Sequence, residues 1–164
     1  MGGEFAQRHE WRHDFSLDWH EDEYPSHQGI RLLLADLNEL YKREPALYEN
    51  NFSWEGFEWI DFNDSMNSVL CWLRKGKDPQ DSLVFVANYT PVCRENYRIG
   101  VPSMGYYTES FNSDSSKYWG SNCQNEQEIE TAPIPKHGRT HSISLTLPPL
   151  GVIVLKLDRG YDLI

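Results

Sequence analysis

The residues with the most evident chemistry lie near the N-terminus. His9, Glu10 and His13 have the spacing H-E-x-x-H, which on a helix holds zinc between two imidazoles one turn apart and places a carboxylate to activate water. Glu39 is a possible third ligand. Charged residues surround the pattern, whereas the motif normally lies in a buried, uncharged helix. We therefore expect a polar loop without a metal or any other cofactor, and a zinc peptidase stays as an alternative that metal analysis would test.

The same segment gathers carboxylates and indole rings. Two carboxylates that flank a glycosidic bond perform glycosyl transfer, and flat rings suit sugar faces as well as packed β-structure. Spacing alone does not place any two of these carboxylates at the required separation. The acidic run 21–23 is expected to be a solvated loop, and the two indoles stay open between sugar platforms and packed rings. The residues concerned are Asp14, Asp18, Glu21, Asp22, Glu23, Trp11 and Trp19.

Other familiar chemistry is missing from the sequence. Cys71, Cys93 and Cys123 are odd in number and lack C-x-x-C spacing, so they form neither a disulfide framework nor a zinc knuckle, and a reducing compartment fits them best. There is no glycine-rich phosphate loop. His137 and His141 flank a glycine, so we expect no metal pair there.

Length and charge exclude several classes of partner. The chain has 164 residues and a formal net charge of −10, which corresponds to one domain, or one domain and part of another. The acidic balance argues against nucleic acid and anionic membranes, because both select an excess of Lys and Arg. The apolar runs are far shorter than a membrane span, and the first residues do not resemble a signal peptide. We therefore expect a cytoplasmic protein without nucleic-acid or membrane partners.

One helix is expected to position the N-terminal segment. The first 25 residues show no periodicity and predict a long loop. Apolar residues then recur every three or four positions, which is typical of an amphipathic helix of about 16 residues. Ser26 can cap its start, and Pro45 ends it. Its apolar face needs a partner and comprises Ile30, Leu33, Leu34, Leu37, Leu40 and Tyr41.

The remainder of the chain predicts β-structure. From about residue 52 the apolar period is closer to two, and clusters of Asn, Asp, Gly and Pro separate the apolar segments. Seven short strands with such turns favour a mainly β fold, an antiparallel β-sandwich preceded by a loop and one helix. The expected strands are 57–62, 69–74, 83–88, 97–101, 106–111, 142–147 and 152–157. Residues 112–140 form a polar interruption that is too long for a hairpin turn.

The sequence also resembles a known family in many ordered blocks. These include MGGEF (1–5), SLDW (16–19), ANYTPV (87–92), YRIGVP (97–102) and HGRTHSISLTLPPL (137–150). They resemble the 1,4-alpha-glucan (glycogen) branching enzymes of the alpha-amylase superfamily, from the segment after the eighth barrel strand to about residue 157. The resemblance implies that residues 1–50 are the end of the catalytic (β/α)8 barrel, a loop after strand eight and the last helix. Residues 51–164 would be the C-terminal all-β domain of alpha-amylase type.

The resemblance further implies an activity for the parent enzyme. The family cleaves an α-1,4 bond in a linear glucan and transfers the segment to a 6-hydroxyl, forming an α-1,6 branch in glycogen. An Asp nucleophile, a Glu acid/base and a second Asp carry this retaining reaction. In the family all three precede the segment that Met1 opens, so no catalytic residue carries over. The resemblance thus implies a truncated gene or a fragment, inactive alone, whose partners are α-glucan through the parent enzyme and the missing N-terminal barrel.

Three residues are candidates for substrate binding. The loop after strand eight lies at the catalytic face of such barrels, so the resemblance suggests Glu4, Trp11 and Trp19 as residues that line glucan subsites. A loop-fixing salt bridge and packed indoles explain the same residues equally well. The alternative function is a free-standing glucan-binding or interaction β-sandwich module.

Overall fold

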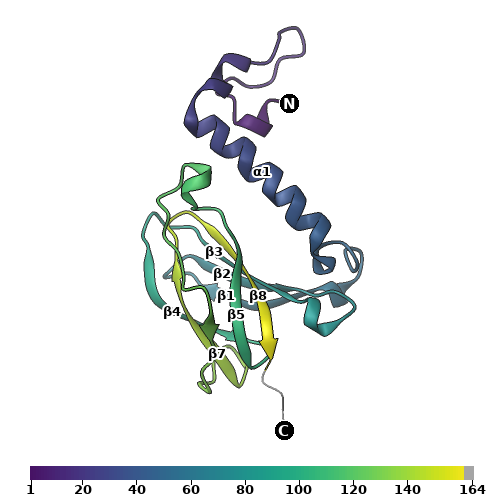
Figure 1. Ribbon diagram of the computed structural model, residues 1–164, viewed down its shortest axis with the longest axis vertical. Coiled ribbons are helices and arrows are strands. Elements are labelled where there is room, and N and C mark those ends of the chain that lie inside the picture. Colours follow the sequence, from purple (N-terminus) through teal and green to yellow (C-terminus); the bar gives the residue numbers. More distant parts are fainter. Residues whose placement is uncertain (161–164) are drawn as a thin grey trace.

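The computed structural model describes residues 1–160 as a β-sandwich with one long helix lying against it (Figure 1). One layer is a six-stranded sheet in the order β1-β2-β3-β8-β5-β6, and the other is the pair β4-β7. All paired strands are antiparallel, so the predicted mainly antiparallel β fold is confirmed. The strands are β1 (Phe57–Asp64), β2 (Val69–Arg74), β3 (Leu83–Asn88), β4 (Arg94–Val101), β5 (Gly105–Asn112), β6 (Ile129–Glu130), β7 (His141–Leu147) and β8 (Val152–Gly160).

The apolar core lies between the two sheets because alternate residues of each strand face inward. In β2, Val69, Cys71 and Leu73 are buried, while the residues between them are only partly covered. Ile99 of β4 and Ile143 of β7 meet this face from the second sheet. Burial of one such aliphatic side chain stabilises a fold by about 1.5–3 kcal/mol. This core fixes the register of the strands, since a slip of one residue would expose it.

The seven predicted strands are all present, with ends within three residues of those expected. The sequence pattern missed β6, which lies in the polar interruption. This strand has two residues, and they pair with Tyr106 and Tyr107 of β5. A strand of that length has no room for an alternating pattern, so its place depends on its pairing with β5, on the burial of Ile129 in the core and on the bridge from Ala132 to Ser142 of β7.

Helix α1 (Pro25–Arg43) starts one residue before the predicted cap. The position that caps the helix is held by Tyr24, which makes no side-chain capping bond, and Pro25 occupies the first turn. The prediction that Ser26 caps the helix is therefore wrong. The ring of Pro25 already has a helical φ and lacks an N–H that would need a partner, so it starts the helix without a polar cap.

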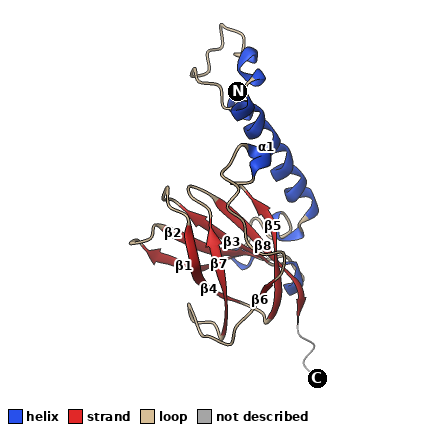
Figure 2. Cartoon of the chain, turned by 60° about the vertical axis from the view of Figure 1, so that its left-hand side comes forward, coloured by secondary structure: helices blue, strands red, loops and turns tan. Residues whose placement is uncertain are grey.

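Only part of the predicted apolar face of α1 is covered. Leu40 is buried and Leu33 is partly buried, in a second apolar cluster between α1 and the outer face of the six-stranded sheet. Leu37 and Tyr41 are exposed, contrary to the expectation that the whole face packs on a partner. Figure 2 shows that the N-terminal half of α1 extends away from the strands and carries residues 1–24 at its far end. Within residues 1–160, no helix is long and apolar enough to cross a membrane.

Two contacts fix α1 beside the sandwich at mid-helix. Gly29 approaches the loop after β5 so closely that a Cβ there would lie 2.4 Å from the carbonyl oxygen of Tyr118. About two turns further on, Asp36 accepts hydrogen bonds from Lys117 and from the hydroxyl of Tyr118. A larger residue at position 29 would therefore push the loop off the helix.

The C-terminal end of α1 is joined to β8 by an ion pair whose carboxylate is buried. Glu44, only 3% exposed, accepts a hydrogen bond from Lys156 Nζ at 2.7 Å and one from Arg43 Nε at 2.9 Å. Burial alone would raise the pKa of this carboxyl, but the bonds from Lys156 and Arg43 outweigh it and hold the pKa below the usual value. Glu44 is therefore a buried anion that depends on both partners.

Replacement of this carboxylate should loosen the helix from the sandwich. We expect Glu44→Ala to lower the free energy of unfolding by about 3 kcal/mol, because it leaves Lys156 without its closest counter-charge. Urea denaturation at pH 7 measures the change. The matched control is Glu39→Ala, which removes a carboxylate from an exposed pair with Lys42 and should cost less than about 0.5 kcal/mol. Equal losses in the two variants would contradict this role of Glu44.

Candidate functional site

The N-terminal segment is a folded loop that is tied to the start of α1. It contains two short 3-10 turns, Gly3–Phe5 and Trp19–Glu23. His27 of α1 is buried and donates from Nδ1 to the carbonyl of Phe5 at 2.8 Å. Glu21 is also buried and accepts from the backbone N–H of Arg8 at 2.9 Å. The expectation that the run 21–23 is a solvated loop is thus wrong for Glu21, because that carboxylate satisfies a backbone donor 13 residues away.

A cavity of about 400 Å³ lies in this loop, within the size range of small-molecule sites. Trp11 lines it together with residues that can hydrogen-bond, and Arg12 stacks 4.1 Å above the ring of Phe15. One wall carries a hydrogen bond in which His9 Nδ1 lies 2.8 Å from Asp18 Oδ2. The cavity thus offers an indole and several hydrogen-bonding groups, which is the combination that recognises a sugar. We call it the Trp11 cavity.

The three residues suggested for substrate binding lie in different surroundings. Trp11 is 49% exposed and lines the cavity. Trp19 is 61% exposed and stacks on Phe5 at 5.3 Å between ring centroids, outside the cavity lining. Glu4 is exposed and also lies outside it, and a hydrogen bond with its own backbone lowers its pKa. The structure therefore joins Trp11 with His9 and Asp18 rather than with Glu4 or Trp19.

The H-E-x-x-H pattern has no helix beneath it. Residues 6–18 form turns and irregular loop, so His9 and His13 do not stand one helical turn apart. His9 is paired with Asp18, and Glu39 lies on the exposed side of α1 beside Lys42. Among the described residues, no group of three potential ligands could hold a metal ion. The zinc-peptidase alternative therefore has no geometric basis here.

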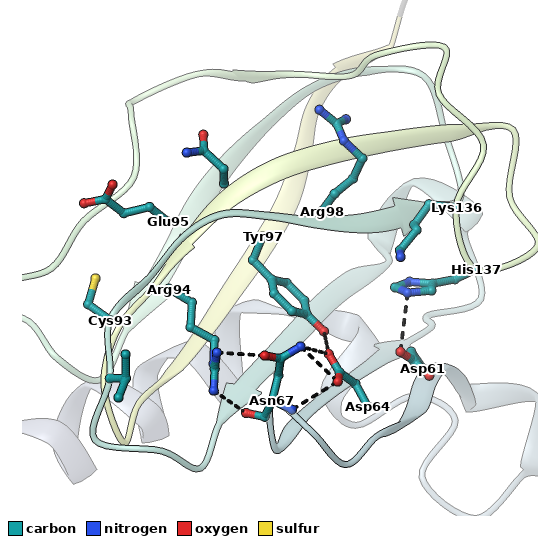
Figure 3. Close-up of a pocket in the computed structure, with 12 residues that line it drawn as sticks. Asp61, Asp64, Asn67, Cys93, Arg94, Glu95, Tyr97, Arg98, Lys136 and His137 are labelled. Carbon is teal, nitrogen blue, oxygen red and sulfur yellow. Dashed lines mark hydrogen bonds and ion pairs between the residues drawn. The ribbon is translucent and has the colours of Figure 1, made fainter.

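A second, polar cavity of about 610 Å³ lies on the sandwich, between β4 and the turn that joins β1 to β2 (Figure 3). Asp64 is the centre of its network and accepts from Tyr97 Oη at 2.6 Å and from Asn67 Nδ2 at 2.8 Å. Arg94 donates to Asn67 Oδ1 at 2.8 Å. On the other side, His137 Nε2 lies 3.4 Å from Asp61 Oδ2. The sequence pattern did not indicate this cluster, because its members come from segments up to 76 residues apart, from Asp61 to His137.

The electrostatics of this network fit a structural role. Burial alone would raise the pKa of Asp64, but the bonds from Tyr97 and Asn67 hold it below the usual range. Burial, and then the bond to Asp64, raises the pKa of Tyr97, so its hydroxyl stays a donor. Burial lowers the pKa of His137, although Asp61 opposes that effect. The result is an anion at Asp64 that is fixed by the neutral donors Tyr97 and Asn67 and by the nearby charge of Arg94.

Comparison with known families connects the sandwich to one fold family. Residues 59–158 match the family described as alpha amylase, C-terminal all-beta domain. The match starts in β1 and ends in β8. It therefore covers the sandwich and leaves out α1 and the N-terminal loop.

Comparison with curated proteins extends further along the chain. The 1,4-alpha-glucan branching enzyme GlgB of Aquifex aeolicus is 56% identical over 156 residues, which are 95% of this chain and 25% of that protein. The enzyme of the same name from Marinobacter nauticus is 51% identical over 157 residues, again 95% and 25%. Among solved structures, an alpha-amylase from H.orenii aligns with a TM-score of 0.46 and 20% identity over 88% of this chain and 23% of that chain. The chain thus spans about a quarter of the length of the curated relatives it matches.

The Asp64 network should make stability depend on acid pH. Because folding lowers the pKa of Asp64, its contribution is complete above the unfolded pKa of about 3.8 and is lost as the pH falls through the lower folded value. We expect Asp64→Ala to reduce the free energy of unfolding by about 1–2 kcal/mol at pH 7, and by progressively less below about pH 4. Urea titrations at a series of pH values from about 3 to about 7 measure it. Asp14→Ala, at an exposed pair with Arg12, is the control, and a pH-independent loss in Asp64→Ala would contradict the network.

Proposed function

The chain belongs to the alpha-amylase C-terminal all-beta domain family, and on that premise we propose that it forms the C-terminal part of a 1,4-alpha-glucan branching enzyme. The observation that carries the proposal is the identity of 56% with a branching enzyme over 95% of this chain. That span includes α1 and the N-terminal loop, which lie outside the β-domain match. A common β-domain alone would not extend the similarity to those segments.

The proposed reaction of the parent enzyme is transfer of an α-1,4-glucan segment to a 6-hydroxyl, which forms an α-1,6 branch in glycogen. We propose that the catalytic Asp, Glu and Asp belong to the barrel outside this chain, so the chain alone is inactive. The acidic residues around the Trp11 cavity support the proposal that the barrel carries out catalysis and that this chain contributes to binding. Asp18 is already paired with His9, and Asp14 with Arg12, so these carboxylates suit binding better than nucleophilic attack.

We propose that the Trp11 cavity contacts α-glucan in the parent enzyme. Trp11 would provide a ring face for a sugar, and His9, Asp18 and the neighbouring amides would bond its hydroxyls. Trp19 and Glu4 would contact the glucan outside the cavity, since both are exposed on the same loop. An acidic chain with formal charge −10 fits a neutral polysaccharide better than nucleic acid.

The missing barrel is the proposed partner of the exposed aromatic residues on β1. Trp59 meets Trp72 at 6.2 Å between centroids, and Trp72 stacks on Phe85 at 5.2 Å. This row crosses the outer face of the six-stranded sheet and ends beneath α1, where Phe85 packs in the helix cluster. Its other end is uncovered, and we call Phe57, Trp59 and Phe62 the outer aromatic surface. If α1 is the last helix of the barrel, the rest of the barrel would lie beside α1 over this surface.

We also propose a cytoplasmic location. The three cysteines are free thiols in the structure, which fits a reducing compartment.

A free-standing glucan-binding module is the second candidate. The outer aromatic surface favours it, because exposed rings of this kind also bind sugars. The two proposals place the sugar-binding rings on different elements, the N-terminal loop in the first and β1 in the second. Variants of one ring from each element therefore separate them.

A chimera tests the first proposal. We expect this chain to replace the matching 156 residues of the Aquifex aeolicus enzyme and to keep kcat/KM within about tenfold of the parent, a loss of about 1.4 kcal/mol of transition-state stabilisation. The fall in iodine staining of amylose measures branching. The isolated 164-residue chain is the control and should give no fall. A folded but inactive chimera, or clear branching by the isolated chain, would refute the proposal.

Affinity electrophoresis in glycogen gels tests the binding site. We expect the 164-residue chain to be retarded, and Trp11→Ala to raise its Kd for glycogen about tenfold through the loss of about 1.4 kcal/mol of ring contact. Trp59→Ala, an equally exposed indole on β1, is the matched control and should not change the retardation. Loss of retardation in Trp59→Ala but not in Trp11→Ala would favour the module instead.

A further inference from the structure

Two cysteines that are 30 residues apart in sequence meet on the surface of the sandwich. The sulfur atoms of Cys93 and Cys123 lie 2.7 Å apart, and neither cysteine is in a disulfide. A disulfide has a sulfur separation of about 2.05 Å, so a small displacement would join them. The number and spacing of cysteines in the sequence gave no sign of this pair, because it depends on how two connections fold.

The loop between β5 and β6 carries Cys123, and hydrogen bonds to its backbone fix its position. Asp114 is buried and accepts from the backbone N–H of Cys123 at 2.9 Å, while the carbonyl of Cys123 accepts from Asn112 Nδ2 at 2.9 Å. Asp114 also accepts from the N–H and the hydroxyl of Ser121. The backbone around Cys123 is therefore fixed by two buried side chains at the end of β5.

The connection that carries Cys93 is fixed on both sides of the cysteine. Asn88 is buried and donates from Nδ2 to the carbonyl of Val92 at 2.8 Å. Arg94 donates to Asn67 Oδ1 at 2.8 Å. Both cysteines thus lie on backbone that is already ordered, so a disulfide between them would cost little further conformational entropy.

The three thiols differ in access to solvent. Cys93 is exposed and Cys123 is partly covered, whereas Cys71 is buried between the sheets. Burial raises the pKa of Cys71 to about 12, so that thiol is inert in the folded protein. Burial, and then the hydrogen bond with Cys93, also raises the pKa of Cys123. An external reagent therefore reaches Cys93 first.

We propose that Cys93 and Cys123 are a thiol–disulfide modification site that exchanges with a low-molecular-weight disulfide. In the first step the Cys93 thiolate attacks one sulfur of that disulfide, forms a mixed disulfide and releases one thiolate. In the second step the Cys123 thiolate attacks Cys93 Sγ, forms the Cys93–Cys123 bond and releases the second thiolate. The two protein thiols lose two protons and two electrons, and the external disulfide is reduced to two thiols.

The bond would clamp the loop on which α1 rests. The loop between β5 and β6 carries Lys117 and Tyr118, and both donate to Asp36 of α1. The clamp would tie this loop to the connection between β3 and β4 through Cys93. Oxidation would thereby stabilise the packing of this loop against α1, and reduction would reverse that stabilisation. This inference is independent of the proposed function, because it rests on the thiols and the loop alone.

The 164-residue chain treated with oxidised glutathione tests the proposal. We expect peptide mass mapping without reduction to give a Cys93–Cys123 crosslinked peptide with Cys71 free. Closure of a 30-residue loop should raise the Tm by about 10 °C relative to the dithiothreitol-treated sample. Dithiothreitol should reverse both changes.

Two single variants are the controls. Cys123→Ser should trap glutathione on Cys93, and Cys93→Ser should resist modification, and both should lose the rise in Tm. The proposal is overturned if the unsubstituted chain keeps glutathione on Cys93 with Cys123 free, or if neither thiol reacts. A crosslink that forms without a rise in Tm would overturn the clamp.

Discussion

The arrangement of the whole chain depends on one buried carboxylate. Glu44 lies where α1 ends and is removed almost wholly from water, which is costly unless the charge is paired and hydrogen-bonded. Lys156 from β8 and Arg43 from the helix provide both. Pro45 follows at once and starts a short turn, so the helix can neither continue nor swing. The direction of α1, and with it the position of the N-terminal loop, is therefore set at its C-terminal end.

The sequence predicted most elements of the fold because each has its own local pattern. β2 and β3 have the expected ends, since alternation and flanking turn residues define them. The side-chain bonds that join one element to another have no such local pattern in the sequence. Lys156 lies 112 residues from Glu44, and Tyr97 lies 33 from Asp64, so neither bond follows from composition or period. The start of α1 differs from the prediction for a local reason, because Pro25 begins the helix without a polar cap.

The sequence predicted only part of the candidate site. Residue types and the family resemblance identified Trp11, Trp19 and Glu4, but the structure surrounds Trp11 alone with a cavity. Glu21 resembled a solvated acid in the sequence. It is buried because Arg8 needs a partner for its backbone N–H, and because His27 lies 4.0 Å away. Folding thus buries Glu21, which holds the backbone of the loop, and leaves Glu23 of the same acidic run exposed to solvent.

The exposed side of α1 and the outer aromatic surface of β1 are connected by contacts between residues that are distant in sequence. Tyr41 of α1 packs against Tyr48 at 6.0 Å between centroids and accepts a hydrogen bond from Asn51. Asn51 in turn accepts from Arg74, whose strand pairs with β1 at Phe57. The exposed side of α1 therefore continues into the outer aromatic surface. Contiguous exposed apolar residues often mark a site of protein contact, and one body that packs beside α1 would cover both surfaces at once.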